Sequence, residues 1–354
     1  MPCKEFKGAL MKINLRPEAL EDLVARVLAA NGMSGENARI VAGVVAAAER
    51  DGARSHGLFR IPGYIGTLRS GWVNGKSVPK VADAAPGAVT TDADNGYSQI
   101  ALAASRPLLL EKLKRNGIAH LAIRNSHHFA ALWPDVEPFA AAGFLAFSFV
   151  NTRSRVAPWG ATKRLLGTNP MAFACPRRNA PPMVWDQASS VTAMGEVMLA
   201  AQDGHAVAED VGIDAEGRST TDPKAIMAGG ALLPFGGHKG SAIAAMVEIL
   251  AAALTGGRFG FEDRSAQFPG AESSNAGQSV ILLDPSVTGG TAFPARVEEL
   301  FSRLMSVGVS RLPGDRRYAA RRRAERDGIF IESKTHDYLR SLLPASDPEH
   351  SNAL

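Results

Sequence analysis

Cysteine is almost absent from this sequence of 354 residues, which has only Cys3 and Cys175. Two such residues, one of them close to the chain start, exclude a disulfide framework, so we expect a reducing compartment. Residues 1–12 lack the apolar core of a signal peptide, and the longest uncharged apolar stretch, 138–152, is too short to cross a bilayer. These absences predict a cytoplasmic globular protein without a membrane span.

Two nucleotide-binding patterns are also missing. The sequence contains no G-x-G-x-x-G, which a Rossmann dinucleotide site uses so that the backbone can approach the pyrophosphate, and no G-x-x-x-x-G-K-[ST] of a P-loop. The formal net charge is only +4, with 45% hydrophobic and 21% charged residues, which is ordinary for a folded protein. Any nucleotide must therefore be bound by another fold, and nucleic acid is not expected as a partner.

Hydrophobic spacing predicts alternating helices and strands after a helical N-terminal region. Helices are expected over 16–32, 34–52, 58–68, 100–116, 134–142, 240–254, 298–307 and 335–343. Strands are expected over 88–91, 118–123, 145–150, 171–174, 184–185 and 279–283, and residues 70–87 are expected to form an irregular meander. The Ala-rich helix 240–254 is predicted to be buried. This order of elements indicates an α/β or mixed α+β fold.

The first candidate site is the turn Ser55-His56-Gly57, followed by Arg60. A guanidinium can hold a carboxylate through two hydrogen bonds, and an imidazole exchanges a proton near neutral pH. The combination therefore suits a substrate with a carboxylate. The alternative is a helix-capping serine followed by a surface histidine and arginine.

A pair of histidines, His127 and His128, follows the strand predicted at 118–123. Adjacent histidines can suggest a metal, but neighbouring side chains diverge and a third ligand at close spacing is missing, the nearest carboxylate being Asp135. We prefer a turn in which His128 and the backbone contact a ligand. A metal-dependent hydrolase or lyase using His127 and His128 is the alternative from a different class.

Three further segments place polar groups at turns. Thr168, before one strand, can donate to an anion, and Asp186, at the end of another, can orient a base, although small polar residues are common in any turn. His238 and Lys239 lie in a glycine-rich loop that opens the helix predicted from 240, and a helix N-terminus with a lysine suits a phosphate or carboxylate. A glycine turn that only enters the helix is the alternative.

The last feature is an arginine-rich run from Arg311 to Arg326 that holds seven arginines. It suits a nucleotide phosphate, a basic binding surface or, from Arg321 onward, a solvated helix. Tyr318 is its only aromatic residue, so base stacking has no support there.

Taken in order, these segments resemble the malate/L-lactate dehydrogenase superfamily that lacks a Rossmann fold. The matching motifs are Ser-His-Gly-Leu-Phe-Arg at 55–60, residues 125–129, Gly-Thr-Asn-Pro-Met-Ala-Phe at 167–173, Asp-Pro-Lys at 222–224, residues 234–240 and Arg-Leu-Pro-Gly at 311–314. The run 127–139 is similar to the branch of Δ1-piperideine-2-carboxylate/Δ1-pyrroline-2-carboxylate reductases. The sequence departs from the family at Gln187 and Ser189, and residues 259–276 find no match.

The resemblance implies a non-Rossmann, NAD(P)-binding fold with a mixed sheet, divided into a domain of residues 1–120 with 285–354 and a central cofactor domain of residues 121–284. It implies a homodimer that reduces cyclic imino acids to L-pipecolate and L-proline with NADPH. The alternative on the same fold is an NAD(P)-dependent 2-hydroxy-acid dehydrogenase. A metal is not required for either reaction.

The resemblance also implies roles for individual residues. His56 would donate the proton, with Ser55 and Asp186 behind it as a relay, and Arg60 and Thr168 would hold the substrate carboxylate. The cofactor would contact His128, Phe129, Ala130, Ala131, Leu132, Asp186, Gln187, Ala188, His238, Lys239, Arg311, Gly314, Asp315, Arg316 and Arg317.

Residue chemistry favours NADPH over NADH, because planar guanidinium groups at Arg311, Arg316 and Arg317 suit a 2′-phosphate. Asp315 lies among them, and a carboxylate there suits the ribose hydroxyl of NADH. NADH therefore stays possible as a second cofactor.

Overall fold

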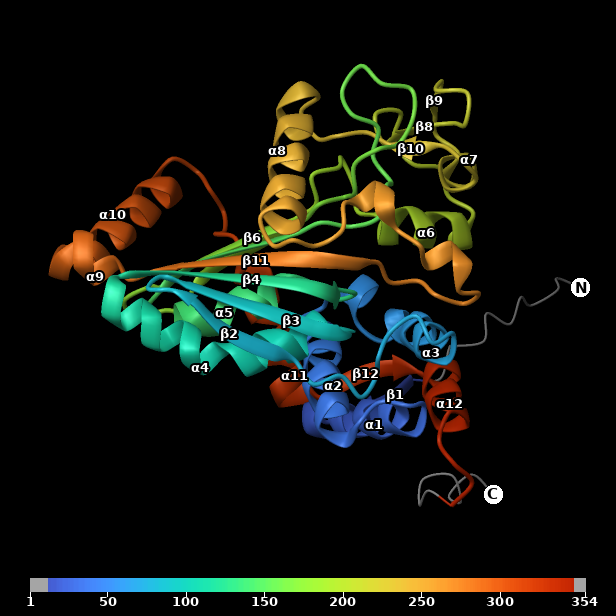
Figure 1. The fold of residues 1–354 in the computed structure, drawn as a ribbon, viewed down its shortest axis with the longest axis horizontal. Helices are drawn as coiled ribbons and strands as arrows, with labels where there is room; N and C mark the ends of the chain where they lie inside the picture. Colours follow the sequence, from blue (N-terminus) through green and yellow to red (C-terminus); the bar gives the residue numbers. More distant parts are fainter. Residues whose placement is uncertain (1–11, 347–354) are drawn as a thin grey trace, which may run out of the picture.

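A seven-stranded mixed sheet forms the centre of the protein in the computed structural model, which describes residues 12–346 (Figure 1). The strand order is β2-β3-β4-β11-β5-β6-β7, in which β3 and β4 are parallel and every other pair is antiparallel. The strands are β2 (Lys80–Ala85), β3 (Ala88–Tyr97), β4 (Ile118–His127), β5 (Leu145–Val150), β6 (Met171–Cys175), β7 (Met183–Gln187) and β11 (Asn275–Leu283). This arrangement confirms the predicted mixed sheet.

The longer helices follow the apolar spacing of the sequence. In α1, for example, Leu20, Leu23, Val24 and Val27 are buried on one face. The helices are α1 (Pro17–Ala30), α2 (Gly35–Arg50), α3 (Ile61–Arg69), α4 (Ser98–Asn116), α5 (Trp133–Ala141), α6 (Met194–Asp203), α7 (Pro223–Met227), α8 (His238–Glu248), α9 (Pro285–Thr288), α10 (Phe293–Ser306), α11 (Asp315–Asp327) and α12 (Ser333–Ser341).

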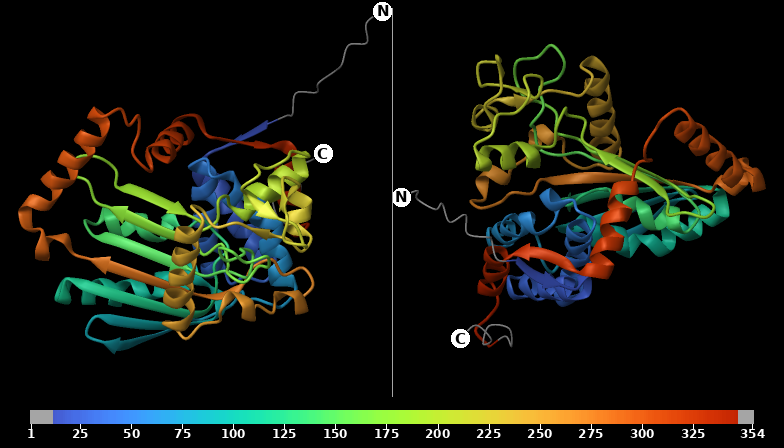
Figure 2. Two further views of the ribbon diagram at one scale, coloured as in Figure 1. Left: turned by 90° about the horizontal axis from the view of Figure 1, so that it is seen from above. Right: turned by 180° about the vertical axis from the view of Figure 1, so that it is seen from behind.

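Helices cover the two faces of the sheet unequally. Helices α4 and α5 lie along one face, where Leu109, Val136 and Phe139 pack against side chains of the strands. On the other face, Val247 of α8 and Ala251 of the π-helical turn after it pack against Phe149. Figure 2 shows that α8 crosses only part of this face.

Both ends of the described chain meet beside the sheet. Strand β1 (Lys12–Leu15) pairs antiparallel with β12 (Ile329–Glu332), and α1 packs near α12 (Figure 1). Their apolar side chains share one core with those of α2 and α3. The division into domains at residues 120 and 284 stays a prediction.

A small lobe follows β7 and was missed by the sequence analysis. It contains α6, α7 and the short strands β8 (Gly212–Ile213), β9 (Ser219–Thr220) and β10 (Ala231–Leu232). Its core consists of few residues, with Val197, Val211 and Ile226 at its centre. A strand of two residues is too short to show an alternation of apolar and polar side chains, so β8, β9 and β10 could not be predicted from the sequence.

Two sequence predictions need correction. Residues 70–87 were expected to be irregular, but they contain β2, an edge strand whose side chains are mostly exposed and therefore give no hydrophobic alternation. The helix predicted at 240–254 begins at His238 and changes at Ile249 into a π-helical turn that ends at Ala253. It is also not buried throughout, because Met246, Ile249 and Leu254 are 40–59% exposed.

No helix within residues 12–346 is both long and apolar enough to span a membrane.

Candidate active site

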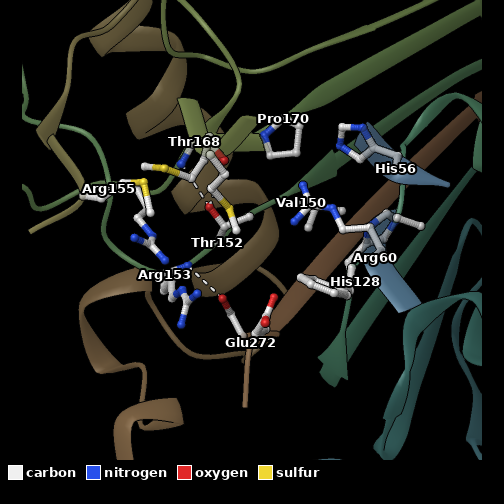
Figure 3. Close-up of a pocket in the computed structure, with 16 residues that line it drawn as sticks. His56, Arg60, His128, Val150, Thr152, Arg153, Arg155, Thr168, Pro170 and Glu272 are labelled. Atoms are coloured by element: carbon white, nitrogen blue, oxygen red, sulfur yellow. Dashed lines mark hydrogen bonds between the residues drawn. The ribbon is translucent and has the colours of Figure 1, made fainter. Parts of the chain in front are cut away.

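A pocket of about 230 Å³ opens where the small lobe meets the sheet and the N-terminal helices (Figure 3). The predicted residues His56, Arg60, His128 and Thr168 all line it. They come from two short 3₁₀ turns, from the end of β4 and from the loop before β6. The fold thus brings together four predicted site residues that come from three segments, the first and last of which are more than a hundred positions apart in the chain.

His56 ends the 3₁₀ turn Arg54–His56, and its Nδ1 shares a hydrogen bond of 3.1 Å with Ser55 Oγ. This bond orients the ring and leaves Nε2 for another partner. Burial, followed by the positive charges of Arg60 and His128, lowers the pKa of His56 to about 3. The imidazole is therefore neutral at neutral pH in the free protein, and an anion beside Arg60 would raise its proton affinity.

Arg60 ends the next 3₁₀ turn, Leu58–Arg60, and its Nε donates to the backbone carbonyl of Ser55 at 2.8 Å. Its guanidinium carbon lies 5.0 Å from the centre of the Phe129 ring. The carbonyl and the ring fix the guanidinium group from two sides. Its two terminal nitrogens stay available to a carboxylate in the pocket.

His128 lies at the end of β4 and has a buried carboxylate behind it. Its Nε2 is 2.8 Å from Asp135 Oδ2, and both side chains are 3% exposed. Gln278 on β11 donates to the same oxygen at 2.6 Å. Asp135, itself held by Gln278, fixes the ring of His128. The sequence analysis had noted Asp135 only as the carboxylate nearest to the two histidines.

The loop Gly167–Pro170 is tied to the strand beside it. The backbone N–H of Thr168 donates to Thr152 Oγ1 at 2.9 Å, and the two threonine hydroxyls are 3.2 Å apart. Asn169 has a positive φ of 38°, and its carbonyl accepts a hydrogen bond from Ser189 Oγ at 2.8 Å. Ser189, a departure from the family pattern, thus holds the loop that carries Thr168.

A second cavity, of about 330 Å³, lies beside the end of β7. Val184 and Trp185 of β7 line one part of it. The arginine-rich segment lines the rest, with Arg311, Gly314, Arg316 and Arg317. Arg317 packs 4.7 Å over the ring of Trp133 and donates to the Val184 carbonyl at 2.9 Å. Its Nε is buried and has no hydrogen-bond partner within the described residues.

Asp186 connects this cavity with the start of α5. Its Oδ1 accepts from Arg317 at 3.2 Å, and its Oδ2 accepts from the backbone N–H groups of Leu132 and Trp133 at 3.1 and 3.3 Å. These bonds place Asp186 beside residues 128–132, where the cofactor was expected. The relay from Asp186 to Ser55 and His56 stays a prediction.

The other predicted cofactor residues are dispersed. Phe129 and Ala130 line the first pocket, whereas Ala131 and Leu132 are buried in the core below it. Gln187 is exposed at the end of β7, next to the half-buried Ala188. His238 and Lys239 are exposed at the start of α8, and in the described chain they line neither cavity.

Asp315 bonds within its own segment, because its Oδ2 accepts from the backbone N–H of Leu312 at 2.8 Å. This bond shapes the turn around Gly314, whose φ is 96°. The carboxylate therefore has a structural partner in the arginine-rich segment.

The two adjacent histidines face different surroundings. His127 is fully buried, with Nδ1 2.9 Å from Ser273 Oγ and Nε2 3.0 Å from Asn95 Oδ1. Its ring therefore contacts two neutral groups, while His128 contacts Asp135. No cluster of three or more His, Cys, Asp or Glu suited to a metal lies within residues 12–346.

Arg321 is not the solvated side chain that the arginine-rich run suggested. It is partly buried, and it forms ion pairs with Asp51 of the α2 C-cap and with Glu137 of α5, the latter at 2.6 Å. Arg322, Arg323 and Arg326 are exposed, as a solvated helix would require. Arg321 thus connects three helices.

Sequence reasoning missed several residues of the first pocket. They are Arg153 and Arg155 from the loop after β5, Met194, Met198 and Met227 from α6 and α7, and Glu272 and Ser274 from the segment before β11. The segment 259–276, which matched no family motif, therefore supplies part of the pocket wall. Isolated arginines and methionines in loops and short helices have no distinctive spacing, so no sequence signal identified them.

This chain belongs to the malate/L-lactate dehydrogenase family, whose model matches residues 15–340. It is 51% identical over 324 residues to a Δ1-pyrroline-2-carboxylate/Δ1-piperideine-2-carboxylate reductase of Pseudomonas putida, which covers 92% of this chain and 95% of the relative. The resemblance to that reductase branch is thereby confirmed.

Solved structures support the same relationship. The Δ1-piperideine-2-carboxylate reductase of Pseudomonas syringae pv. tomato superposes with a TM-score of 0.92 at 50% identity, covering 93% of this chain and 99% of that one. A malate dehydrogenase of Entamoeba histolytica superposes with a TM-score of 0.85 at 22% identity, covering 94% and 97%, which shows the shared fold.

Proposed function

We propose that this protein reduces cyclic imino acids, Δ1-piperideine-2-carboxylate to L-pipecolate and Δ1-pyrroline-2-carboxylate to L-proline, with NADPH. The observation that carries the proposal is the joint presence of Arg60 and His56 in one pocket of a chain 51% identical to a reductase of that name. One group recognises the carboxylate, and the other lies where a proton must be delivered.

Arg60 and Thr168 bind the carboxylate of the substrate. The terminal nitrogens of Arg60 bind its two oxygens, and the Thr168 hydroxyl donates a third hydrogen bond. Because Arg60 is fixed by the Ser55 carbonyl and the Phe129 ring, the carboxylate sets the orientation of the imine carbon. Misplacing this clamp therefore affects both binding and turnover.

Reduction of the C=N bond needs a hydride at carbon and a proton at nitrogen. A bound nicotinamide cofactor would supply the hydride. His56 delivers the proton through Nε2 while Ser55 holds Nδ1. Burial is the main reason why the pKa of His56 is low, and the charge of Arg60 lowers it further. A carboxylate bound to Arg60 offsets that second contribution and raises the proton affinity of His56. The amine leaves with one new C–H and one new N–H bond.

The residues around the second cavity fit the phosphate end of the cofactor. Arg311, Arg316 and Arg317 line it, and planar guanidinium groups suit the oxygens of a phosphate. Between the cavities, the Asp186 contacts with the start of α5 hold the strip 128–132 in place. Arg311, Arg316 and Arg317 would hold the 2′-phosphate, and Phe129 and Ala130 would lie near the reacting end.

The arrangement of Asp315 supports NADPH over NADH. A carboxylate in a site for NADH accepts the ribose hydroxyls. In Asp315, Oδ2 already accepts the backbone N–H of Leu312, which fixes the carboxylate in its own turn and leaves Oδ1 for such a contact. The surrounding arginines favour the additional phosphate.

An assay of NADPH oxidation decides between this function and its rival on the same fold. The substrates are Δ1-piperideine-2-carboxylate, Δ1-pyrroline-2-carboxylate, pyruvate with and without methylamine, and oxaloacetate. We expect the two cyclic imines to give the highest kcat/KM. Turnover of oxaloacetate alone would instead establish an NAD(P)-dependent 2-hydroxy-acid dehydrogenase.

We also propose a homodimer acting in the cytoplasm. Helix α10 projects from the body (Figure 1), and Leu300 together with Val307 at its C-cap is 56–78% exposed, an apolar surface that a second copy can cover. The one described cysteine, Cys175, is buried and free, which suits a reducing compartment. Light scattering of Leu300→Glu against wild type tests the dimer: loss of the dimer supports this face, and an unchanged dimer excludes it.

A further inference from the structure

The two residues at the centre of the proposed reaction end two adjacent 3₁₀ turns. His56 ends the turn Arg54–His56, and Arg60 ends the turn Leu58–Arg60, with Gly57 at the junction between them. The carbonyl of Gly57 accepts the backbone N–H of Arg60 at 2.9 Å. Whatever holds this junction therefore sets the distance between the proton donor and the group that binds the carboxylate.

A buried carboxylate lies directly behind the junction. Glu49, in the last turn of α2, has a side chain that is 7% exposed, and its Oε2 accepts the backbone N–H of Leu58 at 3.0 Å. Leu58 begins the second turn, so its N–H has no acceptor within that turn. Because Leu58 is itself buried, leaving this N–H unpaired would be costly. Glu49 thus caps the turn that carries Arg60.

The glutamate side chain also packs against Gly57. A Cβ added to Gly57 would overlap Oε2 of Glu49 and would lie 3.2 Å from its Cβ and its Cδ. The side chain of Glu49 thus fills the space that any larger residue at position 57 would need. A movement of either residue is therefore passed to the other.

The charge of Glu49 contributes less to the site than its position does. Burial raises the pKa of Glu49, and the Leu58 N–H and the charge of Arg54 act in the opposite direction. Arg54 Nε is 3.7 Å from Oε1, but the arginine side chain is 70% exposed, so this ion pair is weak. The charges that act on His56 are those of Arg60 and His128. What Glu49 gives the site is a hydrogen bond and a close contact.

We propose that Glu49 is a positioning residue of the reaction, which holds the junction at Gly57 and so sets the spacing of His56 and Arg60. The substrate needs this spacing, because its imine nitrogen and its carboxylate are attached to the same carbon atom. A displacement of about 1 Å at such a site can cost roughly a hundredfold in rate. The inference rests on the proposed function, which gives His56 and Arg60 their roles. Glu49 does not line the pocket, so it acts only through them.

The test compares Glu49→Ala and Glu49→Gln with the wild type. Glu36→Ala is the matched control, because Glu36 is an exposed glutamate at the other end of α2. For each protein, kcat and KM are measured with Δ1-piperideine-2-carboxylate, and the dissociation constants of NADPH and of pyridine-2-carboxylate are measured by calorimetry. Pyridine-2-carboxylate has a carboxylate next to a ring nitrogen but no imine to reduce, so it reports on Arg60 without turnover. Thermal unfolding of each variant separates lost stability from lost positioning.

We expect Glu49→Ala to lower kcat/KM for the imine by roughly a hundredfold, through a lower kcat and a higher KM together. Its dissociation constant for pyridine-2-carboxylate should rise by about tenfold, because the guanidinium group no longer meets the carboxylate in line. NADPH affinity should not change. Glu49→Gln keeps an acceptor oxygen for Leu58 and should stay within about fivefold of the wild type. Glu36→Ala should behave as the wild type does.

Gly57→Ala tests the same contact from the other side, and it replaces Glu49→Ala if that variant does not fold. The added Cβ displaces the carboxylate, so kcat should fall and KM should rise as in Glu49→Ala. The double variant should lose little more than either single variant, since both remove one contact.

Four results overturn the inference. They are wild-type kcat and KM in Glu49→Ala or in Gly57→Ala, losses that add up in the double variant, an equal loss in Glu36→Ala, and a loss in Glu49→Gln as large as in Glu49→Ala. The last result would show that the site needs the charge of Glu49 and not its hydrogen bond.

Turnover of Δ1-piperideine-2-carboxylate by the wild type separates the two levels of the account. If the imine is reduced and Glu49→Ala is equally active, only the positioning role fails. If the wild type reduces no imine, the proposed function fails, and the affinities for pyridine-2-carboxylate still show whether Glu49 orients Arg60.

Discussion

The two cavities differ in how the chain builds them. The substrate pocket draws Arg60, His128, Arg153 and Glu272 from four distant segments, whereas the second cavity takes all its arginines from the stretch 311–317. Within residues 12–346 the guanidinium groups of the first cavity form no ion pair, whereas Arg317 of the second is paired with Asp186. A contiguous motif can be read from the sequence, but an assembled pocket becomes visible only in the fold.

The largest effect is expected in the substrate pocket, from His56→Ala. Removing the proton donor should lower kcat by roughly 10²–10⁴-fold with little change in NADPH affinity. The rate is measured with Δ1-piperideine-2-carboxylate under saturating NADPH. Ser55→Ala should have a smaller effect, since it only frees the ring, and near-normal kcat in His56→Ala would show that the proton comes from another group.

Arg60→Ala is expected to come next. It removes the charge-assisted clamp, so the KM for the imino acid should rise by roughly 10–100-fold, with a drop in kcat because the imine carbon is no longer oriented. Arg60→Lys keeps the charge but not the planar pair of donors, and should recover only part of the activity. Full activity in Arg60→Ala would place the substrate carboxylate elsewhere.

Two histidines, His56 in the pocket and the buried His127 outside its lining, should lower the free energy of unfolding in acid. Burial holds the pKa of both His56 and His127 near 3, so below about pH 6.5 the unfolded chain takes up protons that the folded protein excludes. Stability is therefore lost as the pH falls from 7 to 5, by roughly 2 kcal/mol for each histidine. Urea unfolding at several pH values measures this slope, and His56→Asn should reduce it by about half. An unchanged slope in His56→Asn would mean that His56 is protonated in the folded state.

The smallest of these effects concerns cofactor choice at the second cavity. Arg316→Ala should lower kcat/KM for NADPH by about tenfold and leave that for NADH nearly unchanged. Arg316 is the better choice for this test, because Arg317 also contacts Asp186 and Trp133 and its loss would disturb the cavity itself. Arg322→Ala, an exposed neighbour on α11, serves as the control. Equal losses with both cofactors would show that Arg316 does not recognise the 2′-phosphate.

Several features were predictable because their signals are local. The helices expected over 16–32 and 34–52 and the strand expected over 145–150 are present as α1, α2 and β5. The turn that holds Ser55 and His56 could be recognised because the motif is contiguous. Local chemistry was sufficient wherever neighbouring residues act together.

Other features depend on contacts that no local pattern records. Strand β2 buries almost no side chain, so it has no hydrophobic alternation to detect. Arg153 and Arg155 become pocket residues only because α6, α7 and the segment before β11 pack around them. The Asp135 carboxylate gains its role from a histidine seven residues away and from Gln278 on a distant strand.

The central claim is that the two cavities are the two ends of one imine-reducing site. The most direct test incubates the wild type with NADPH deuterated on the transferable side of nicotinamide C4 and with Δ1-piperideine-2-carboxylate, and analyses the product by NMR and mass spectrometry. The account predicts L-pipecolate with a single deuterium at C2 and an added N–H proton from water. Unlabelled pipecolate, or deuterium transfer to oxaloacetate but not to the imine, would contradict it.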